Sequence, residues 1–232
     1  MNGQERTHLD LFSGIGGFAL AARWAGYQTI AFCEQDRFCQ GVLDRWWPKV
    51  PCVQDVHDLD GNEYKGVTLL TGGFPCTPYS SSGLKRGKED DRALWPEMVR
   101  VVSEARPTWV LGENVAGFVN MGLDDMLSDL EGLGYATQTF CIPACAVNAP
   151  HRRNRAWVVA HADRQRGCGG DSPRKDAAHA RQPPRRPLAG HWDLEPDVGR
   201  VAHGIPNRTH RLAALGNAIV PAVAYEIISA MQ

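Results

Sequence analysis

The sequence contains no Cys-x-x-Cys pair and no apolar run long enough to cross a membrane. Its seven cysteines are odd in number and scattered, which argues against a disulfide framework and against a four-ligand zinc site. A membrane span needs about 18 consecutive apolar residues, and no stretch approaches that length. The polar start, Met-Asn-Gly-Gln-Glu-Arg, lacks the apolar centre of a signal peptide. These absences favour a cytoplasmic protein with no structural metal and no membrane attachment.

Charge is nearly balanced over the whole chain but is unevenly distributed. The 232 residues carry a net charge of −1, and 43% of them are hydrophobic, as in a typical globular domain. Between His151 and Arg186, ten Lys or Arg stand against three Asp, so this segment carries seven excess positive charges and the remainder a net −8. A basic, turn-rich segment on an acidic chain favours a polyanionic partner, although a solvated loop explains such a run at least as well.

Apolar strands alternate with helices of roughly ten residues along most of the chain. We expect strands at residues 9–12, 28–33, 67–71, 108–111, 135–142 and 155–160. We expect helices at residues 18–25, 37–47, 92–105, 123–133 and 212–231. This order predicts the α/β class, with a Rossmann-like, doubly wound and mostly parallel sheet. From 161 to about 200 the periodicity is lost, which predicts a main domain of residues 1–160 plus 201–232 and a short irregular lobe of residues 161–200.

A glycine turn joins the first expected strand to the first helix. Its sequence, Ser13-Gly14-Ile15-Gly16-Gly17, places backbone N–H groups at a helix N-terminus, where a ligand can approach closely. Glu34 ends the second strand about twenty residues later, the offset at which a carboxylate accepts hydrogen bonds from ribose hydroxyls. The turn reads Gly-x-Gly-Gly, which favours an adenosine-bearing ligand without a pyrophosphate. A turn with a purely structural role is the alternative.

The run Gly-Gly-Phe-Pro-Cys-Thr-Pro-Tyr-Ser at residues 72–80 follows a short buried strand. Pro75 and Pro78 stiffen the loop around Cys76, which presents the thiol at the end of a sheet. Such a loop suits a nucleophile. The alternative is that Cys76 is a small buried apolar residue, as free cysteines usually are.

A carboxyl group and two arginines follow later in the chain. The carboxyl ends of parallel strands meet at one sheet edge, so Glu34, Cys76 and Glu113 should lie together. Glu113 beside a thiol would donate a proton to the ring that the thiol attacks. Arg153 and Arg155 have the period of a strand, so both should face one side and offer planar donors for a carbonyl or a phosphate. A capping carboxylate and ordinary surface arginines remain the alternatives.

Taken in order, these segments strongly resemble the C5-cytosine DNA methyltransferases, and in particular their compact, phage-type members. The matching segments are Asp10-Leu-Phe-Ser-Gly-Ile-Gly-Gly17, Glu34 with Asp36, Asp55, Gly73-Phe-Pro-Cys76, Glu113-Asn-Val115, Arg153-x-Arg155 and Gly216-Asn217-Ala218. The resemblance implies the fold of class I S-adenosylmethionine-dependent methyltransferases. It implies that residues 1–160 and 201–232 form the catalytic domain, and that the lobe of residues 161–200 recognises the target.

The resemblance also implies a set of site residues. S-adenosylmethionine would be the methyl donor and S-adenosylhomocysteine the product, with no metal. The implied cofactor residues are Phe12, Ser13, Gly14, Gly16, Gly17, Glu34, Asp55, Val56, Phe74, Leu94, Asn217 and Ala218. Within that set Phe12 would stack on the adenine, Glu34 would hold the ribose and Asp55 the adenine amino group. The implied catalytic residues are Cys76, Glu113, Arg153 and Arg155, with Pro75 and Asn114.

The implied reaction is the transfer of a methyl group to C5 of a flipped-out cytosine through a covalent Cys76 adduct. The implied partner is double-stranded DNA, bound by a monomer in a bacterial or phage-infected cell, alongside a cognate restriction enzyme. Two alternatives keep the fold: the same chemistry on RNA, and a nucleic-acid-binding remnant without turnover. A nicotinamide dehydrogenase is a more distant alternative, because it has no use for the Pro-Cys loop or the paired arginines.

Overall fold

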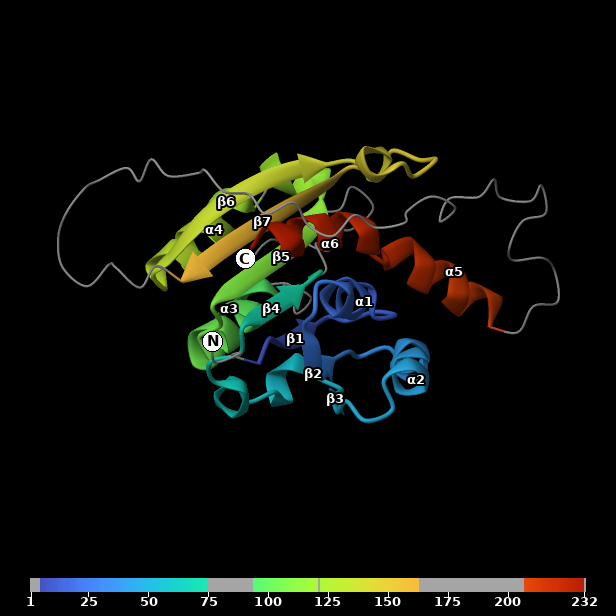
Figure 1. The fold of residues 1–232 in the computed structure, drawn as a ribbon, viewed down its shortest axis with the longest axis horizontal. Helices are drawn as coiled ribbons and strands as arrows, with labels where there is room; N and C mark the ends of the chain where they lie inside the picture. The colour runs from blue at the N-terminus through green and yellow to red at the C-terminus, as the bar shows by residue number, and fades with distance from the viewer. Residues whose placement is uncertain (1–4, 75–93, 121, 163–206, 232) are drawn as a thin grey trace, which may run out of the picture.

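The computed structural model describes residues 5–74, 94–120, 122–162 and 207–231, which form a sheet covered on both faces by helices (Figure 1). The seven strands are β1 (Thr7–Leu11), β2 (Gln28–Cys33), β3 (Cys52–Val53), β4 (Leu69–Gly72), β5 (Trp109–Val115), β6 (Tyr135–Ile142) and β7 (Arg155–Ala162). Their order is β3-β2-β1-β4-β5-β7-β6. The first five are mutually parallel, and β7 runs antiparallel to both β5 and β6. The predicted α/β class and mostly parallel sheet are confirmed.

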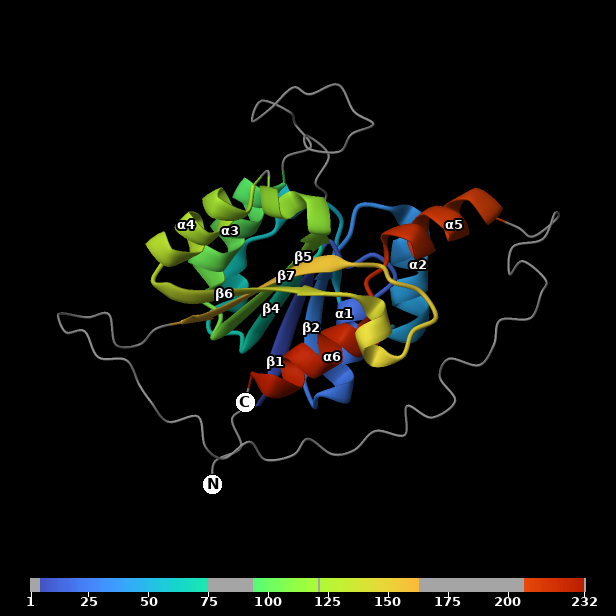
Figure 2. The same ribbon diagram turned by 90° about the horizontal axis from the view of Figure 1, so that it is seen from above.

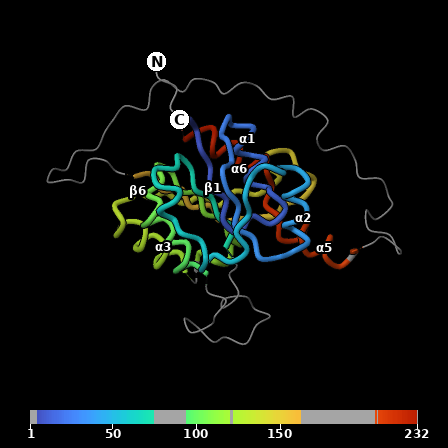
Figure 3. The backbone as a smooth tube through the Cα atoms, turned by 90° about the horizontal axis from the view of Figure 1, so that it is seen from below, coloured from blue at the N-terminus to red at the C-terminus, as the bar shows by residue number. Residues whose placement is uncertain are grey.

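The helices divide between the two faces of the sheet, as Figure 2 shows. One face carries α1 (Gly17–Trp24), α2 (Arg37–Trp46) and α6 (Pro221–Ala230), and the other carries α3 (Trp95–Ala105) and α4 (Leu123–Gly132). Alternate strand residues fill the two cores: Leu70 packs toward α3, whereas its neighbour Leu69 packs toward α1 and α6. The helix α5 (Arg208–Asn217) lies near α2, at the opposite end of the molecule from α3 and β6 (Figure 3).

The C-terminal segment differs from the prediction of one helix over residues 212–231. Two helices, α5 and α6, are separated by Ala218–Val220. Pro221 explains the break, because proline lacks the N–H that a continuous helix needs and drives the preceding residue into an extended conformation. Val220 accordingly has φ −89° and ψ 105°. By length and composition alone, Thr209–Ala230 is apolar enough to cross a membrane, but its α6 half is packed in the core beside α1.

Several element boundaries also differ from the expected ones. β5 continues to Val115, so Glu113 and Asn114 lie within the strand and not after it. The short edge strand β3 has no counterpart in the prediction, because two residues carry no periodicity. By contrast, β2 and β6 have the predicted bounds. The expected lobe of residues 161–200 lies almost entirely outside the described residues, so that division of the chain stays a prediction.

A chain of buried polar side chains crosses the centre of the sheet. His8 Nδ1 lies 2.9 Å from Thr29 Oγ1, and His8 Nε2 lies 2.8 Å from Thr71 Oγ1. Thr71 in turn donates to Asp10 Oδ1 at 2.8 Å. Burial lowers the pKa of His8 to about 3 and raises the pKa of Asp10 well above its usual value. These contacts join the side chains of β1 to those of β2 and β4, its neighbours on either side in the sheet.

Thr71→Val should therefore destabilise the protein more than the matched change Thr29→Val. Thr71 has two polar partners in this chain and Thr29 has one, and a buried polar group left without a partner costs about 1–3 kcal/mol. Urea unfolding of the two variants measures the difference. An equal or smaller loss for Thr71→Val would contradict the view that Thr71 joins two buried partners and Thr29 only one.

Candidate functional site

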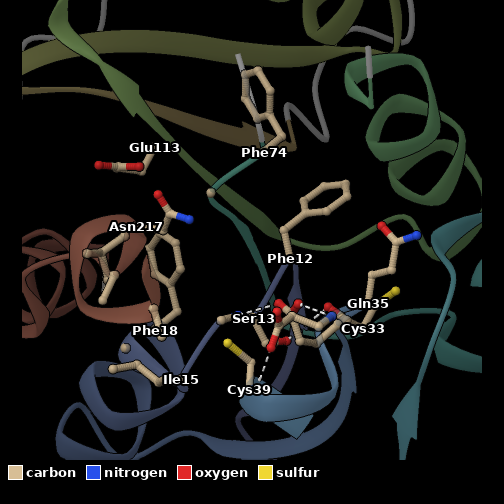
Figure 4. Close-up of a pocket in the computed structure, with 18 of the residues that line it drawn as sticks. Phe12, Ser13, Ile15, Phe18, Cys33, Gln35, Cys39, Phe74, Glu113 and Asn217 are labelled. Carbon is tan, nitrogen blue, oxygen red and sulfur yellow. Dashed lines mark hydrogen bonds between the residues drawn. The ribbon is translucent and has the colours of Figure 1, made fainter. Parts of the chain in front are cut away.

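A pocket of about 870 Å³ opens where the carboxyl ends of β1, β2, β4 and β5 meet. Phe12 follows β1, Glu34 follows β2 and Phe74 follows β4, so the parallel strands deliver these residues to one edge. Figure 4 shows Glu113 and Phe74 toward one end of the pocket, and Gln35, Cys33 and Cys39 toward the other. The residues that fall at this edge therefore form one continuous cavity with two chemically different ends.

The glycine turn and Glu34 form one hydrogen-bonded unit. Gly14 N donates to Glu34 Oε2 at 2.6 Å, and Asp36 N donates to Glu34 Oε1 at 2.7 Å. Gly14 has φ 54°, a left-handed conformation that glycine adopts at little cost. The two backbone donors fix both carboxylate oxygens of Glu34, which keep further lone pairs for a ligand's hydroxyls. Phe12, with φ 52°, turns the chain between β1 and this unit.

The Asp55 wall of the pocket is held by an arginine from α3. Asp55 Oδ1 accepts from the backbone N–H of His57 at 3.0 Å and lies 2.7 Å from His57 Nδ1, and these contacts lower the pKa of Asp55. Arg100 donates to the carbonyl of Val56 at 2.7 Å and to the carbonyl of Leu59 at 3.0 Å. This wall includes the short 3₁₀ helix η1 (Val56–Asp58), which lies outside the sheet. Arg100 supplies the donors that hold it against α3.

At the other end of the pocket, Glu113 forms an ion pair with Arg155. Arg155 Nε lies 2.9 Å from Glu113 Oε1. Glu113 is only 8% exposed. Burial raises the pKa of Glu113 to about 7, while Arg155 and Arg153 oppose that rise. A carboxyl group with a pKa near neutrality can both give and take a proton at physiological pH.

The chain that leads toward Cys76 is anchored beside Glu113. Phe74 is 5% exposed, and its ring packs against Trp95 and Phe118 at centroid distances of 5.2 and 5.4 Å. Asn114 Nδ2 donates to the carbonyl of Phe74 at 3.3 Å. Pro75 and Cys76 lie outside the described residues, so their predicted roles stay predictions. Phe74, the last described residue before the predicted nucleophile loop, therefore lies in the pocket wall.

Arg153 has different partners from Arg155. It precedes β7 and has φ 30°, so the strand alternation that predicted a shared face does not apply to it. Its Nη2 donates to the carbonyl of Gly216 at 2.6 Å and to the carbonyl of Ala218 at 2.5 Å. Arg155 lines the pocket, whereas Arg153 contacts the backbone of two residues that line it, Gly216 and Ala218.

Most of the predicted site residues line this one pocket. They are Phe12, Ser13, Gly14, Gly17, Glu34, Asp55, Val56, Phe74, Leu94, Glu113, Asn114, Arg155, Asn217 and Ala218. Gly16 is not among the lining residues: a methyl group there would lie 2.7 Å from the ring of Trp47, so Gly16 allows α1 to pack closely on the end of α2. Gly16 therefore has a packing role, and its predicted contact with the cofactor stays a prediction.

One face of α5 lines the pocket and was not predicted to do so from the sequence. His210, Ala213 and Ala214 line the pocket together with Asn217. Their spacing of i, i+3, i+4 and i+7 places them on one face of a helix. The sequence shows this spacing, but alanine side chains have no polar group that would indicate a ligand site. The ring of His210 stacks on Phe38 of α2 at a centroid distance of 6.1 Å. Among the described residues, no group of three or more His, Cys, Asp or Glu is arranged to hold a metal ion.

Comparison with known proteins matches most of the chain to one family. The C-5 cytosine-specific DNA methylase family matches residues 7–184. The type II methyltransferase M.NgoMIV of Neisseria gonorrhoeae is 33% identical over 161 residues, which are 66% of this chain and 51% of that protein. The type II methyltransferase M.AluI of Cellulosimicrobium cellulans is 40% identical across 66% of this chain and 33% of its own length. The chain thus spans about half or less of the length of these relatives.

Solved structures share the fold. A variant of Spodoptera frugiperda DNMT2 superposes with a TM-score of 0.58 at 21% identity, over 70% of this chain and 51% of that one. The S. pombe Dnmt2 methyltransferase superposes with a TM-score of 0.59 at 20% identity, over 72% of this chain and 53% of that one. With the family match over residues 7–184 and the pocket at the carboxyl edge of the sheet, the chain belongs to the C-5 cytosine-specific DNA methylase family.

Proposed function

We propose that this chain transfers a methyl group from S-adenosylmethionine to C5 of a cytosine in double-stranded DNA. The observation that carries the proposal is the buried Glu113–Arg155 pair, which shares one pocket with the Gly14–Glu34 unit. The first provides a proton donor and a cation for a pyrimidine ring, and the second provides a place for an adenosine. A methyltransferase of this family needs both in one cavity.

The residues at the Glu34 end fit the proposed methyl donor. Glu34 is oriented by two backbone N–H groups and is suited to accept hydrogen bonds from the ribose hydroxyls. Asp55 keeps one carboxylate oxygen beyond the one that His57 occupies, which suits the adenine amino group. The ring of Phe12, between the two ends of the pocket, offers an aromatic face. S-adenosylmethionine, when bound there, supplies a methyl group on a positively charged sulfur, which C5 of an activated cytosine attacks.

At the Glu113 end, this chain's residues activate the cytosine. The Cys76 thiolate adds to C6, and the electron pair displaced from the C5–C6 bond moves toward N3. Protonated Glu113 donates its proton to N3 and so offsets the charge created by the attack. Arg155 lies beside Glu113 and is suited to hold the cytosine carbonyl. After C5 gains the methyl group it loses its proton to a base, water being a candidate, and the bond between C6 and sulfur breaks.

The DNA would be held outside this pocket. C6 of a stacked cytosine is out of reach of a thiol, so the target base has to be flipped out of the duplex. We assign phosphate contacts to the basic segment of residues 151–186, and selection of the sequence to the lobe of residues 161–200. We further propose that the enzyme acts as a cytoplasmic monomer, in a cell that holds a cognate restriction enzyme.

Cys76 is tested by trapping the covalent adduct. A 5-fluorocytosine duplex incubated with the protein and S-adenosylmethionine should form a complex that survives SDS, because fluorine at C5 blocks the final elimination. Cys76→Ser should abolish this complex, whereas Cys145→Ser should not, because Cys145 is an exposed residue outside the pocket. Adduct on 5-fluorocytosine RNA in place of DNA would contradict the DNA assignment. No adduct with either polymer would contradict the reaction itself.

The protonation of Glu113 is tested by the pH dependence of methyl transfer. Since Glu113 acts with its proton on and has a pKa of about 7, kcat should fall as the pH rises above 7, by about tenfold per pH unit. Glu113→Gln should lower kcat by roughly 10²–10⁴-fold and remove this alkaline fall. Arg155→Met should shift the fall to higher pH, because Arg155 lowers the pKa of Glu113. An unchanged profile in both variants would exclude Glu113 as the donor.

A further inference from the structure

The junction between α5 and α6 forms part of the pocket wall although it belongs to no regular element. Asn217, Ala218 and Ile219 all line the pocket. Ile219 packs against two other walls: a methyl group at Gly17 would lie 2.7 Å from Ile219 Cγ1, and one at Gly73 would lie 3.9 Å from Ile219 Cγ2. The junction therefore sits between the start of α1 and the residue that follows β4.

Backbone carbonyls at the end of a helix lack partners within the helix and need donors from elsewhere. At the end of α5 one donor serves two of them, since Arg153 Nη2 reaches the carbonyls of both Gly216 and Ala218. These carbonyls lie 63 and 65 residues away in the sequence. A cation at a helix C-terminus also complements the helix dipole. Arg153 thus caps α5 from the loop that precedes β7.

Arg153 makes both contacts through its guanidinium group. Arg153 is partly buried, and burial together with the nearby Arg155 lowers its pKa from the usual value of a guanidinium. Its left-handed backbone, with φ 30°, is uncommon for a residue other than glycine and turns the chain where β7 begins. Arg155, two residues later, pairs with Glu113 instead. The two arginines of the Arg-x-Arg segment therefore have different partners: Arg155 pairs with Glu113, and Arg153 with the carbonyls of the α5–α6 junction.

We propose that Arg153 is a positioning residue that holds the α5–α6 junction in place as the wall of the cofactor pocket. It does not bind a nucleic acid phosphate or the target base. The inference rests on the proposed function for the identity of the ligand, S-adenosylmethionine. Its consequence is that Arg153 controls the affinity for the cofactor even in the absence of DNA.

The test is calorimetric titration of the full chain with S-adenosylhomocysteine, without nucleic acid. Arg153→Met should raise the dissociation constant by roughly tenfold or more, because both carbonyls lose a charged donor. Arg153→Lys, which keeps the charge and an amine donor, should restore part of the affinity. Arg152→Met is the matched control: it removes one positive charge from the exposed neighbouring residue and should leave this constant unchanged.

Hydrogen–deuterium exchange separates positioning from a general loss of stability. In Arg153→Met the amides of residues 216–220 should exchange faster, while those of β1 and β4 should keep the protection of the wild type. Unchanged affinity and unchanged exchange in Arg153→Met would overturn the proposal, as would loss of affinity with faster exchange throughout the sheet. If the wild-type chain itself does not bind S-adenosylhomocysteine, the proposed function fails instead.

Discussion

The site depends on one ion pair, between the buried Glu113 and the partly buried Arg155, which lie on two strands that run in opposite directions. Arg155 lies opposite Val115 in the register of β5 and β7, and Glu113 is two residues from Val115 on the same strand face. Diagonal neighbours of this kind are within reach of a long side chain, which is why Arg155 Nε meets Glu113 at 2.9 Å. Burial raises the pKa of Glu113 and the two arginines lower it, which together give a pKa of about 7. The antiparallel pairing of β7 with β5 thus places Arg155 where it lowers the pKa of the buried Glu113.

The walls around this pair are held by side chains as much as by the sheet. Strand ends can fix Phe12, Glu34 and Phe74, because the ladder of backbone hydrogen bonds runs up to them. The segments after β3 and between α5 and α6 have no such ladder. Arg100 holds the first through two backbone carbonyls, and Arg153 holds the second in the same way. In both places the guanidinium group of an arginine supplies the hydrogen bonds to backbone carbonyls that a neighbouring strand supplies elsewhere.

Much of this arrangement could be predicted from the sequence, for identifiable reasons. Residues on the parallel strands were placed correctly at one edge, because the α/β alternation determines where strand ends lie. The direction of the Arg153 side chain was not predicted correctly. Its partners lie 63 and 65 residues away in the sequence. Its left-handed backbone, just before β7, also breaks the strand alternation on which the prediction relied. The close packing of Gly16 on Trp47 was also not predicted, because the two residues are far apart in the sequence. Pro221 indicates the break at Ala218–Val220, but the apolar pattern continues on both sides of Pro221 and therefore predicted a single helix.

The central claim is that Glu113 holds a proton near neutral pH because it is buried, despite its pairing with Arg155. The most direct measurement is a carbon-13 NMR titration of the side-chain carboxyl groups in protein labelled at glutamate, with Glu113→Gln used to assign the signal. The account predicts that Glu113 titrates with a pKa of about 7. A signal that titrates near the ordinary value of 4.5 would show a fully ionised carboxylate at neutral pH and would contradict the account.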